Sequence, residues 1–111
     1  MESMTLTIRL PIQLSNKLDL ISKYLGMSKS NLIRVAILKY LDVTELNDFQ
    51  ETRTPSSNSK RINLSLTQFL YSIVKNKADN LNVTVNSLII YGSEKIEKHY
   101  SSMLEELDLK N

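Results

Sequence analysis

The stretch Thr5-Leu6-Thr7-Ile8-Arg9-Leu10-Pro11 decides how this chain folds. Its side chains alternate between polar and apolar, which is the period of a β-strand with one buried face and one exposed face. The proline marks the end of this alternation, and a helical pattern follows it. Because a single short strand is not stable alone in water, the stretch must pair with a second strand.

The chain supplies that partner, since Arg61-Ile62-Asn63-Leu64-Ser65-Leu66-Thr67 repeats the alternation 56 residues later. The same offset aligns the two halves without a gap at strand, helix and cap positions. The aligned pairs are Leu6 and Ile62, Ile8 and Leu64, Leu10 and Leu66, Leu14 and Leu70, Leu18 and Val74, Leu25 and Leu81, Gly26 and Asn82, Ser28 and Thr84, and Leu32-Ile33 and Leu88-Ile89. Agreement at so many kinds of position indicates an internal duplication.

Each repeat reads as a strand, a helix, a short turn and a second helix. Leu14, Leu18, Ile21 and Leu25 form a one-sided helical stripe, and Gly26 can end that helix in a left-handed conformation. Ser28 is a predicted N-cap for the next helix. The apolar face of this second helix consists of Leu32, Ile33, Ala36, Ile37, Tyr40 and Leu41.

The chain divides into a first motif at 1–41, an acidic linker at 42–59, a second motif at 60–97 and a C-terminal helical extension at 98–111. Chains below about 40 residues rarely hold a core unaided, so the two motifs must share one. The predicted fold is therefore mainly α with a small β-ribbon. Two tandem motifs form an intramolecular pseudo-dimer, with a two-stranded antiparallel ribbon and four or more helices. The linker is long enough to allow pairing between chains as well.

The charge of the chain is unevenly distributed. The net charge is only +2, but residues 1–41 carry six basic and two acidic side chains, and residues 60–97 carry five and three. The segment 42–59 carries one basic and four acidic side chains. Such a distribution allows a basic face suited to nucleic acid.

Other features of the composition argue against a secreted, membrane or catalytic protein. Cysteine is absent, which excludes disulfides and thiolate metal sites. No signal peptide is recognisable, and no apolar run approaches the ~20 residues of a membrane span, so we expect a cytoplasmic protein. His99 is the single histidine and has no ligand set nearby, and Glu105, Glu106 and Asp108 read as solvated helix residues. We expect neither a cofactor, nor a metal, nor enzymatic activity.

Three segments resemble the ribbon-helix-helix (Arc/MetJ-like) family of DNA-binding proteins. They are Thr-Leu-Thr-Ile-Arg-Leu-Pro at 5–11, Leu-Gly-Met-Ser-Lys-Ser at 25–30 and Asn-Val-Thr-Val-Asn-Ser at 82–87. The resemblance covers 5–41 and 60–97. The family usually pairs two chains with one motif each, whereas the tandem layout is similar to relaxosome accessory proteins of conjugative plasmids. The second motif departs from the first with Thr67 for Pro11, Asn82 for Gly26 and Val85 for Lys29, which predicts weaker phosphate contact in that half.

A two-stranded ribbon fits the major groove of DNA, where each base pair presents a distinct pattern of donors and acceptors. The outward side chains of the two predicted strands are short and polar, or arginine, as reading bases requires. The predicted base contacts are Thr5, Thr7, Arg9, Arg61, Asn63 and Ser65. Phosphates are expected at the start of the second helix of each motif, where free N–H groups attract anions. The predicted phosphate contacts are Ser28, Lys29, Ser30, Thr84, Val85, Asn86 and Lys60.

Pairing the two strands within one chain predicts the register of the ribbon. Thr7 then faces Asn63, Thr5 faces Ser65, and Arg9 faces Arg61. Both arginines lie at one end and small hydroxyl groups at the other. The hypothesis is a reader of an asymmetric, non-palindromic DNA element, with guanine favoured at the arginine end.

The sequence is compatible with four functions. The first is a transcriptional repressor of a mobile-element or plasmid operon that binds double-stranded DNA. The second is a relaxosome accessory protein that binds a transfer origin and helps a relaxase and a coupling protein. The third is an antitoxin whose segment 98–111 binds a toxin. The fourth is an interaction module that never binds DNA.

The extension continues a helical stripe through Ile96, Tyr100, Met103 and Leu107. One interpretation is a prolonged last helix that packs on the protein's own core, against the segment 43–49. The other is an interface between protomers bound to adjacent DNA sites, which would make the protein a homo-oligomer.

Overall fold

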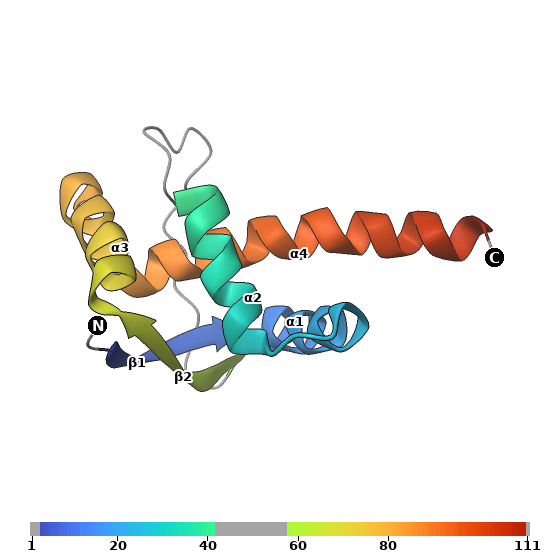
Figure 1. Cartoon of the computed structure of the whole chain (residues 1–111), viewed down its shortest axis with the longest axis horizontal. Coiled ribbons are helices and arrows are strands. Elements are labelled where there is room, and N and C mark those ends of the chain that lie inside the picture. The colour runs from blue at the N-terminus through green and yellow to red at the C-terminus, as the bar shows by residue number, and fades with distance from the viewer. Residues whose placement is uncertain (1–2, 42–57, 111) are drawn as a thin grey trace.

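The computed structural model describes residues 3–41 and 58–110. The chain runs twice through a strand and two helices (Figure 1). The elements are β1 Ser3–Pro11, α1 Ile12–Leu25, α2 Lys29–Ala36, the π-helical turn η1 Ile37–Leu41, β2 Ser59–Thr67, α3 Gln68–Leu81 and α4 Val85–Lys110. The predicted mainly α fold with a small β-ribbon is confirmed. Most of the expected linker, with the segment 43–49, lies outside the described residues.

The two strands pair with each other in an antiparallel ribbon within the single chain. Thr5 lies opposite Ser65, Thr7 opposite Asn63 and Arg9 opposite Arg61, so the predicted register is confirmed. Both strands are longer than predicted, because the ladder continues to the pairs Ser3–Thr67 and Pro11–Ser59. Ser59, which its composition assigned to the linker, therefore begins β2.

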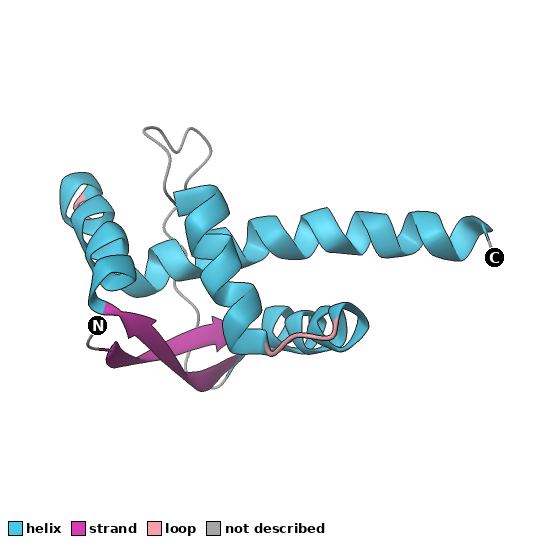
Figure 2. Ribbon diagram, viewed as in Figure 1, coloured by secondary structure: helices cyan, strands magenta, loops and turns pink. Residues whose placement is uncertain are grey.

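All the described helices lie on one side of the ribbon, and no described element covers its other face (Figure 2). The inward side chains Ile8, Leu10, Leu64 and Leu66 are buried in one core that both repeats share. That core also contains apolar residues of α1, α2, α3 and α4. None of the helices in the described part of the chain is long and apolar enough to cross a membrane.

Residues 56 positions apart meet at two places in the fold. Thr7 lies opposite Asn63 at the centre of the ribbon. On the other side of the core, α4 approaches α2 so closely that a Cβ atom on Gly92 would lie 3.4 Å from the carbonyl oxygen of Ala36. Because equivalent residues of two repeats can face each other only on a two-fold axis, these contacts define an approximate two-fold axis through the ribbon and the α2–α4 crossing.

The predicted caps between the helices are present. Gly26 and Asn82 end α1 and α3 in the left-handed conformation, with φ of 71° and 57°. The hydroxyl of Ser28 accepts a hydrogen bond from the Asn31 N–H, and that of Thr84 accepts one from the Ser87 N–H. These caps fix the turn in which each second helix starts.

The sequence did not predict the π-helical turn η1, which follows α2 without a break. The second repeat instead continues as one helix from Val85 to Lys110, and the end of this helix projects from the body (Figure 1). Ile96 is fully buried and Tyr100 is half-buried, whereas Met103 and Leu107 are exposed. The extension therefore packs on the protein's own core over its first part only.

Ser93 is fully buried on α4, and its hydroxyl has no hydrogen-bond partner in the described part of the chain. A buried hydroxyl without a partner costs about 1–3 kcal/mol. We therefore expect Ser93→Ala to raise the free energy of unfolding by about 1 kcal/mol, measured by urea denaturation. Ser102→Ala, at an exposed position of the same helix, is the control and should change stability little. A lower stability of Ser93→Ala would contradict this prediction.

Candidate nucleic-acid interface

The uncovered face of the ribbon carries every residue predicted to contact bases. All of these side chains are exposed, and they form three facing pairs along the ribbon. At the centre, the hydroxyl of Thr7 donates a hydrogen bond to Asn63 Oδ1 at 3.2 Å. This bond leaves the Asn63 amide nitrogen as a donor on the exposed face.

Two arginines occupy one end of this face. Arg9 and Arg61 lie directly opposite each other, and Arg9 Nη1 is 3.5 Å from Ser59 Oγ. Within 3–41 and 58–110, no carboxylate lies within ion-pair distance of either guanidinium. Like charges directly opposite on a ribbon destabilise it. An anionic or electronegative partner over this end of the ribbon would relieve that repulsion.

The N-termini of α2 and α4 flank the two outer edges of the ribbon. From the first turn of α4, Asn86 accepts a hydrogen bond from the Arg9 N–H at 2.7 Å and donates one to the Arg9 carbonyl at 3.0 Å. From α2, Arg34 Nε donates to the Ser65 carbonyl at 2.8 Å. Each strand is thus fixed from its outer edge by the second helix of the other repeat.

The two helix N-termini also share a pattern of backbone donors. In each helix the N-cap hydroxyl binds the third N–H group, that of Asn31 or Ser87. The N–H groups of Lys29, Ser30, Val85 and Asn86 have no acceptor among the described residues. Free N–H groups together with the positive end of the helix dipole form an anion-binding position. One such position lies beside each edge of the ribbon.

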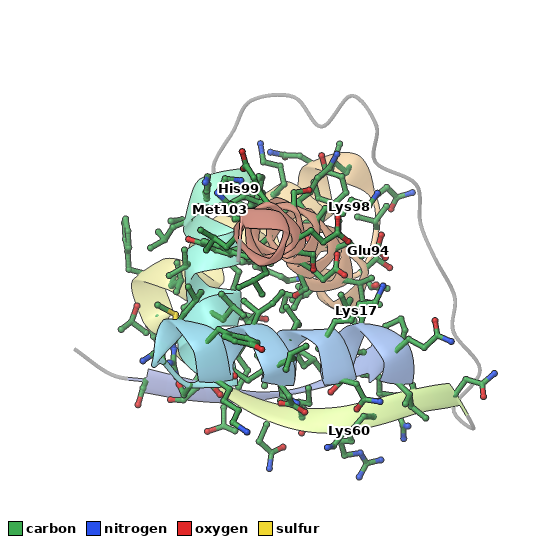
Figure 3. All side chains as sticks on the ribbon, turned by 90° about the vertical axis from the view of Figure 1, so that its right-hand side faces the viewer. Lys17, Lys60, Glu94, Lys98, His99 and Met103 are labelled. Atoms are coloured by element: carbon green, nitrogen blue, oxygen red, sulfur yellow. The ribbon has the colours of Figure 1, made fainter. Side chains whose placement is uncertain are left out.

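The side chain of Lys29, in contrast, is directed into the protein. Its ammonium lies 2.9 Å from Asp19 Oδ1 and 2.9 Å from Ser15 Oγ, and the side chain is only 16% exposed. Its charge is therefore already paired. Lys29 and Val85 therefore differ less in free positive charge than the sequence predicted. Lys60 is exposed at the start of β2, next to Arg61 (Figure 3).

Two contacts of the ribbon were not predicted. Arg34 was not among the expected site residues, and its equivalent in the second repeat is Ile90, so the repeat gave no signal for it. Asn86 was expected to bind phosphate, but its side chain holds the backbone of Arg9. Its backbone N–H and the second hydrogen of its side-chain amide remain as donors for an anion.

The Asn86 contact leads to a prediction about stability. Asn86→Ala removes two hydrogen bonds to the edge of β1, each worth about 0.5–1.5 kcal/mol. We expect urea denaturation to show a loss of about 1–2 kcal/mol, and hydrogen exchange to show faster exchange of the Arg9 amide. Asn76→Ala, at an exposed position of α3, is the matched control. An unchanged Arg9 exchange rate would contradict the assigned role of Asn86.

The described residues contain no group of three or more histidine, aspartate or glutamate side chains placed to hold a metal ion. The exposed ion pair of Lys75 with Asp79 lies on α3 and raises the pKa of Lys75, chiefly through the hydrogen bond from Lys75 to Asp79. This pair is not part of the ribbon.

The fold and the site together define a class: a mainly α protein of two strand–helix–helix repeats that presents a two-stranded ribbon with a basic end. Comparison with known protein families, with curated proteins and with solved structures finds no match to the chain.

Proposed function

We propose that this chain is a sequence-specific double-stranded DNA-binding protein of the ribbon-helix-helix type, acting in the cytoplasm as a transcriptional repressor of a mobile-element or plasmid operon. The observation that carries the proposal is the pair Arg9 and Arg61, which face each other on an uncovered ribbon without a carboxylate partner in the described residues. Arginine binds the O6 and N7 atoms of guanine with two hydrogen bonds in the major groove.

The remaining outward residues suit the same role. The amide nitrogen of Asn63 is a donor for base acceptors at the centre of the ribbon, since its oxygen accepts from Thr7. Thr5 and Ser65 offer short hydroxyl groups at the other end. None of these side chains is long enough to keep the ribbon from entering the groove. Direct reading of base edges is the contact that gives sequence specificity.

The helix N-termini would position the protein on the duplex. With the ribbon in the major groove, the free N–H groups of Lys29 and Ser30 on one side, and of Val85 and Asn86 on the other, face the two DNA backbones. Such contacts set orientation and affinity but carry no sequence information. Binding to any duplex should therefore weaken steeply as salt is raised.

A second candidate is a relaxosome accessory protein that binds a plasmid transfer origin. It is favoured by the asymmetry of the ribbon, because the pair Arg9–Arg61 at one end differs from the pair Thr5–Ser65 at the other. A symmetric homodimer would present identical ends to a palindrome. This ribbon instead suits a non-palindromic element, of the kind that can mark a direction along DNA.

Footprinting tests both candidates. The purified chain is incubated with the DNA upstream of its own coding region and with any neighbouring transfer origin. We expect protection of a short element without internal two-fold symmetry, with guanines at one end. Protection at the promoter supports the repressor, and protection at the transfer origin supports the relaxosome role. A palindromic site within the span of one ribbon, or equal affinity for a random duplex, would contradict the proposal.

A further inference from the structure

Each strand of the ribbon has an outer edge, and one position on each edge is bonded to a helix. On β1 this position is Arg9, whose N–H donates to Asn86 Oδ1 at 2.7 Å and whose carbonyl accepts from Asn86 Nδ2 at 3.0 Å. On β2 it is Ser65, whose carbonyl accepts from Arg34 Nε at 2.8 Å. Both strand residues are exposed and belong to the predicted base contacts. The helices therefore act on the backbone of two residues whose side chains face the proposed DNA.

The two held positions are equivalent in the repeats, because they lie 56 residues apart. The residues that hold them are not equivalent. The first repeat has Ser30 where the second has Asn86. The second repeat has Ile90 where the first has Arg34. The strand end with the arginines is thus fixed at two backbone groups by a neutral amide, and the other end at one carbonyl by a guanidinium.

The arginine end is where the ribbon most needs such a contact. Because the N–H and carbonyl of Arg9 point outward to Asn86, Arg9 does not exchange backbone hydrogen bonds with Arg61. In pairs of this kind the facing side chains come closest, and like charges on them repel. The two bonds from Asn86 tie the Arg9 backbone to α4, which belongs to the shared core, and fix its position against this repulsion.

An arginine recognises guanine only from a well-defined position. Its guanidinium must reach both the O6 and the N7 atoms of one base. Such a site has to be held to within about 0.5 Å by the residues around it. A shift of the β1 end would carry the Arg9 guanidinium with it. Because Asn86 binds both backbone groups of Arg9, it limits that shift.

We propose that Asn86 is a positioning residue for base reading: through the backbone of Arg9 it sets the preference of the protein for guanine at the arginine end of the site. This inference rests on the proposed DNA-binding function. Asn86 acts on specificity more than on affinity, because its two bonds lie within the protein. A displaced Arg9 still offers a positive charge to any duplex but no longer meets both acceptors of a guanine.

Titration of two duplexes at one salt concentration tests this role. One is the duplex protected in the footprint, and the other has its G·C pair at the arginine end replaced by A·T. The ratio of the two dissociation constants measures the preference for guanine. We expect a ratio of about ten or more for the wild type and of less than about three for Asn86→Ala. A variant that is merely less stable binds both duplexes more weakly by the same factor, so its ratio stays at the wild-type value.

Arg34→Met is the matched control. It keeps a long side chain but removes the donor to the Ser65 carbonyl, so it frees the equivalent position of the other strand. Its ratio should stay at the wild-type value. In addition, Asn86→Ala should not lower the ratio any further when Arg9→Ala is already present, because Asn86 acts only through Arg9.

Far-ultraviolet circular dichroism, reporting helix, checks that each variant is folded. Asn86→Leu, which keeps the size of the side chain and removes both bonds, takes the place of Asn86→Ala if that variant does not fold. A wild type with no preference for guanine would contradict the proposed function itself. A wild type that prefers guanine, together with an Asn86→Ala that prefers it equally, would overturn the role of Asn86 alone. An equal loss of preference in Arg34→Met would also overturn this role, since the effect would then be common to both strands.

Discussion

Arg9→Ala is expected to weaken binding to the footprinted DNA by about ten- to a hundredfold, because a guanidinium that binds guanine with two hydrogen bonds contributes about 1–3 kcal/mol of discrimination. The loss should be specific to the contacted guanine. The variant should therefore bind a duplex with another base at this position almost as well as it binds the footprinted duplex. Arg61→Ala should act at the same end of the site. Titrations of both duplexes at fixed salt measure these effects.

The same substitution should leave the stability of the free protein unchanged or raise it. Arg9 and Arg61 face each other without a carboxylate partner in the described residues, so removing one charge relieves repulsion. DNA affinity and the free energy of unfolding would then change in opposite directions. Substitution of a residue that merely supports the fold would lower both the DNA affinity and the free energy of unfolding. This opposition separates a DNA-binding role from a structural one.

Two further variants complete this test. Arg9→Lys keeps the charge but loses the planar group with two donors, so it should retain non-specific binding and lose preference for guanine. Lys23→Ala, at an exposed position of α1, removes one positive charge away from the ribbon and should have a small effect. Equal losses for Arg9→Ala and Lys23→Ala would mean that charge alone is recognised.

The ribbon could be predicted from the sequence because its signals are local and repeated. The alternation at 5–11 recurs after 56 residues, and pairing the two copies about their common centre fixes the register, as the pair Thr7–Asn63 confirms. The caps at Gly26 and Asn82 could be predicted for a similar reason. Each cap depends on a single residue, glycine or asparagine, that adopts the left-handed conformation at a helix end.

The remaining features depend on contacts between segments far apart in the chain. Asn86 binds the backbone of Arg9, and Arg34 binds that of Ser65, so neither role is visible before the repeats are packed together. Lys29 at the start of a helix indicated a phosphate contact, yet Asp19 of the preceding helix pairs its charge. A side chain's direction depends on its tertiary neighbours, which periodicity does not report.

The approximate two-fold axis relates two repeats of one chain that are similar in fold but not identical in sequence. At the axis equivalent positions of the two repeats meet, with Thr7 against Asn63 and Ala36 against Gly92. Away from the axis they diverge: the ribbon carries arginines at one end and hydroxyl groups at the other. Duplication within one chain allows this divergence, because each half can change independently while the shared core constrains both.

Gly92→Leu should therefore be among the most destabilising single substitutions in the chain. A Cβ atom at this position already lies 3.4 Å from the Ala36 carbonyl oxygen and 3.6 Å from Leu41 Cγ. A leucine side chain would force α4 away from α2, and overpacking of this kind costs about 3 kcal/mol. Since the total stability of a domain is about 5–15 kcal/mol, the midpoint of urea denaturation should fall markedly.

Gly92→Ala is the informative companion, because its single added carbon just fits the contact. Alanine also favours a helix interior over glycine by about 1 kcal/mol. We expect this variant to be as stable as the wild type or slightly more so. Asn80→Leu, at an exposed position of α3, controls for the leucine itself. If Gly92→Leu and Asn80→Leu unfold at the same urea concentration, the two helices do not need a small residue where they cross. If only Gly92→Leu is unstable, the close approach at the two-fold axis holds the two repeats, and with them both strands of the ribbon, in one core.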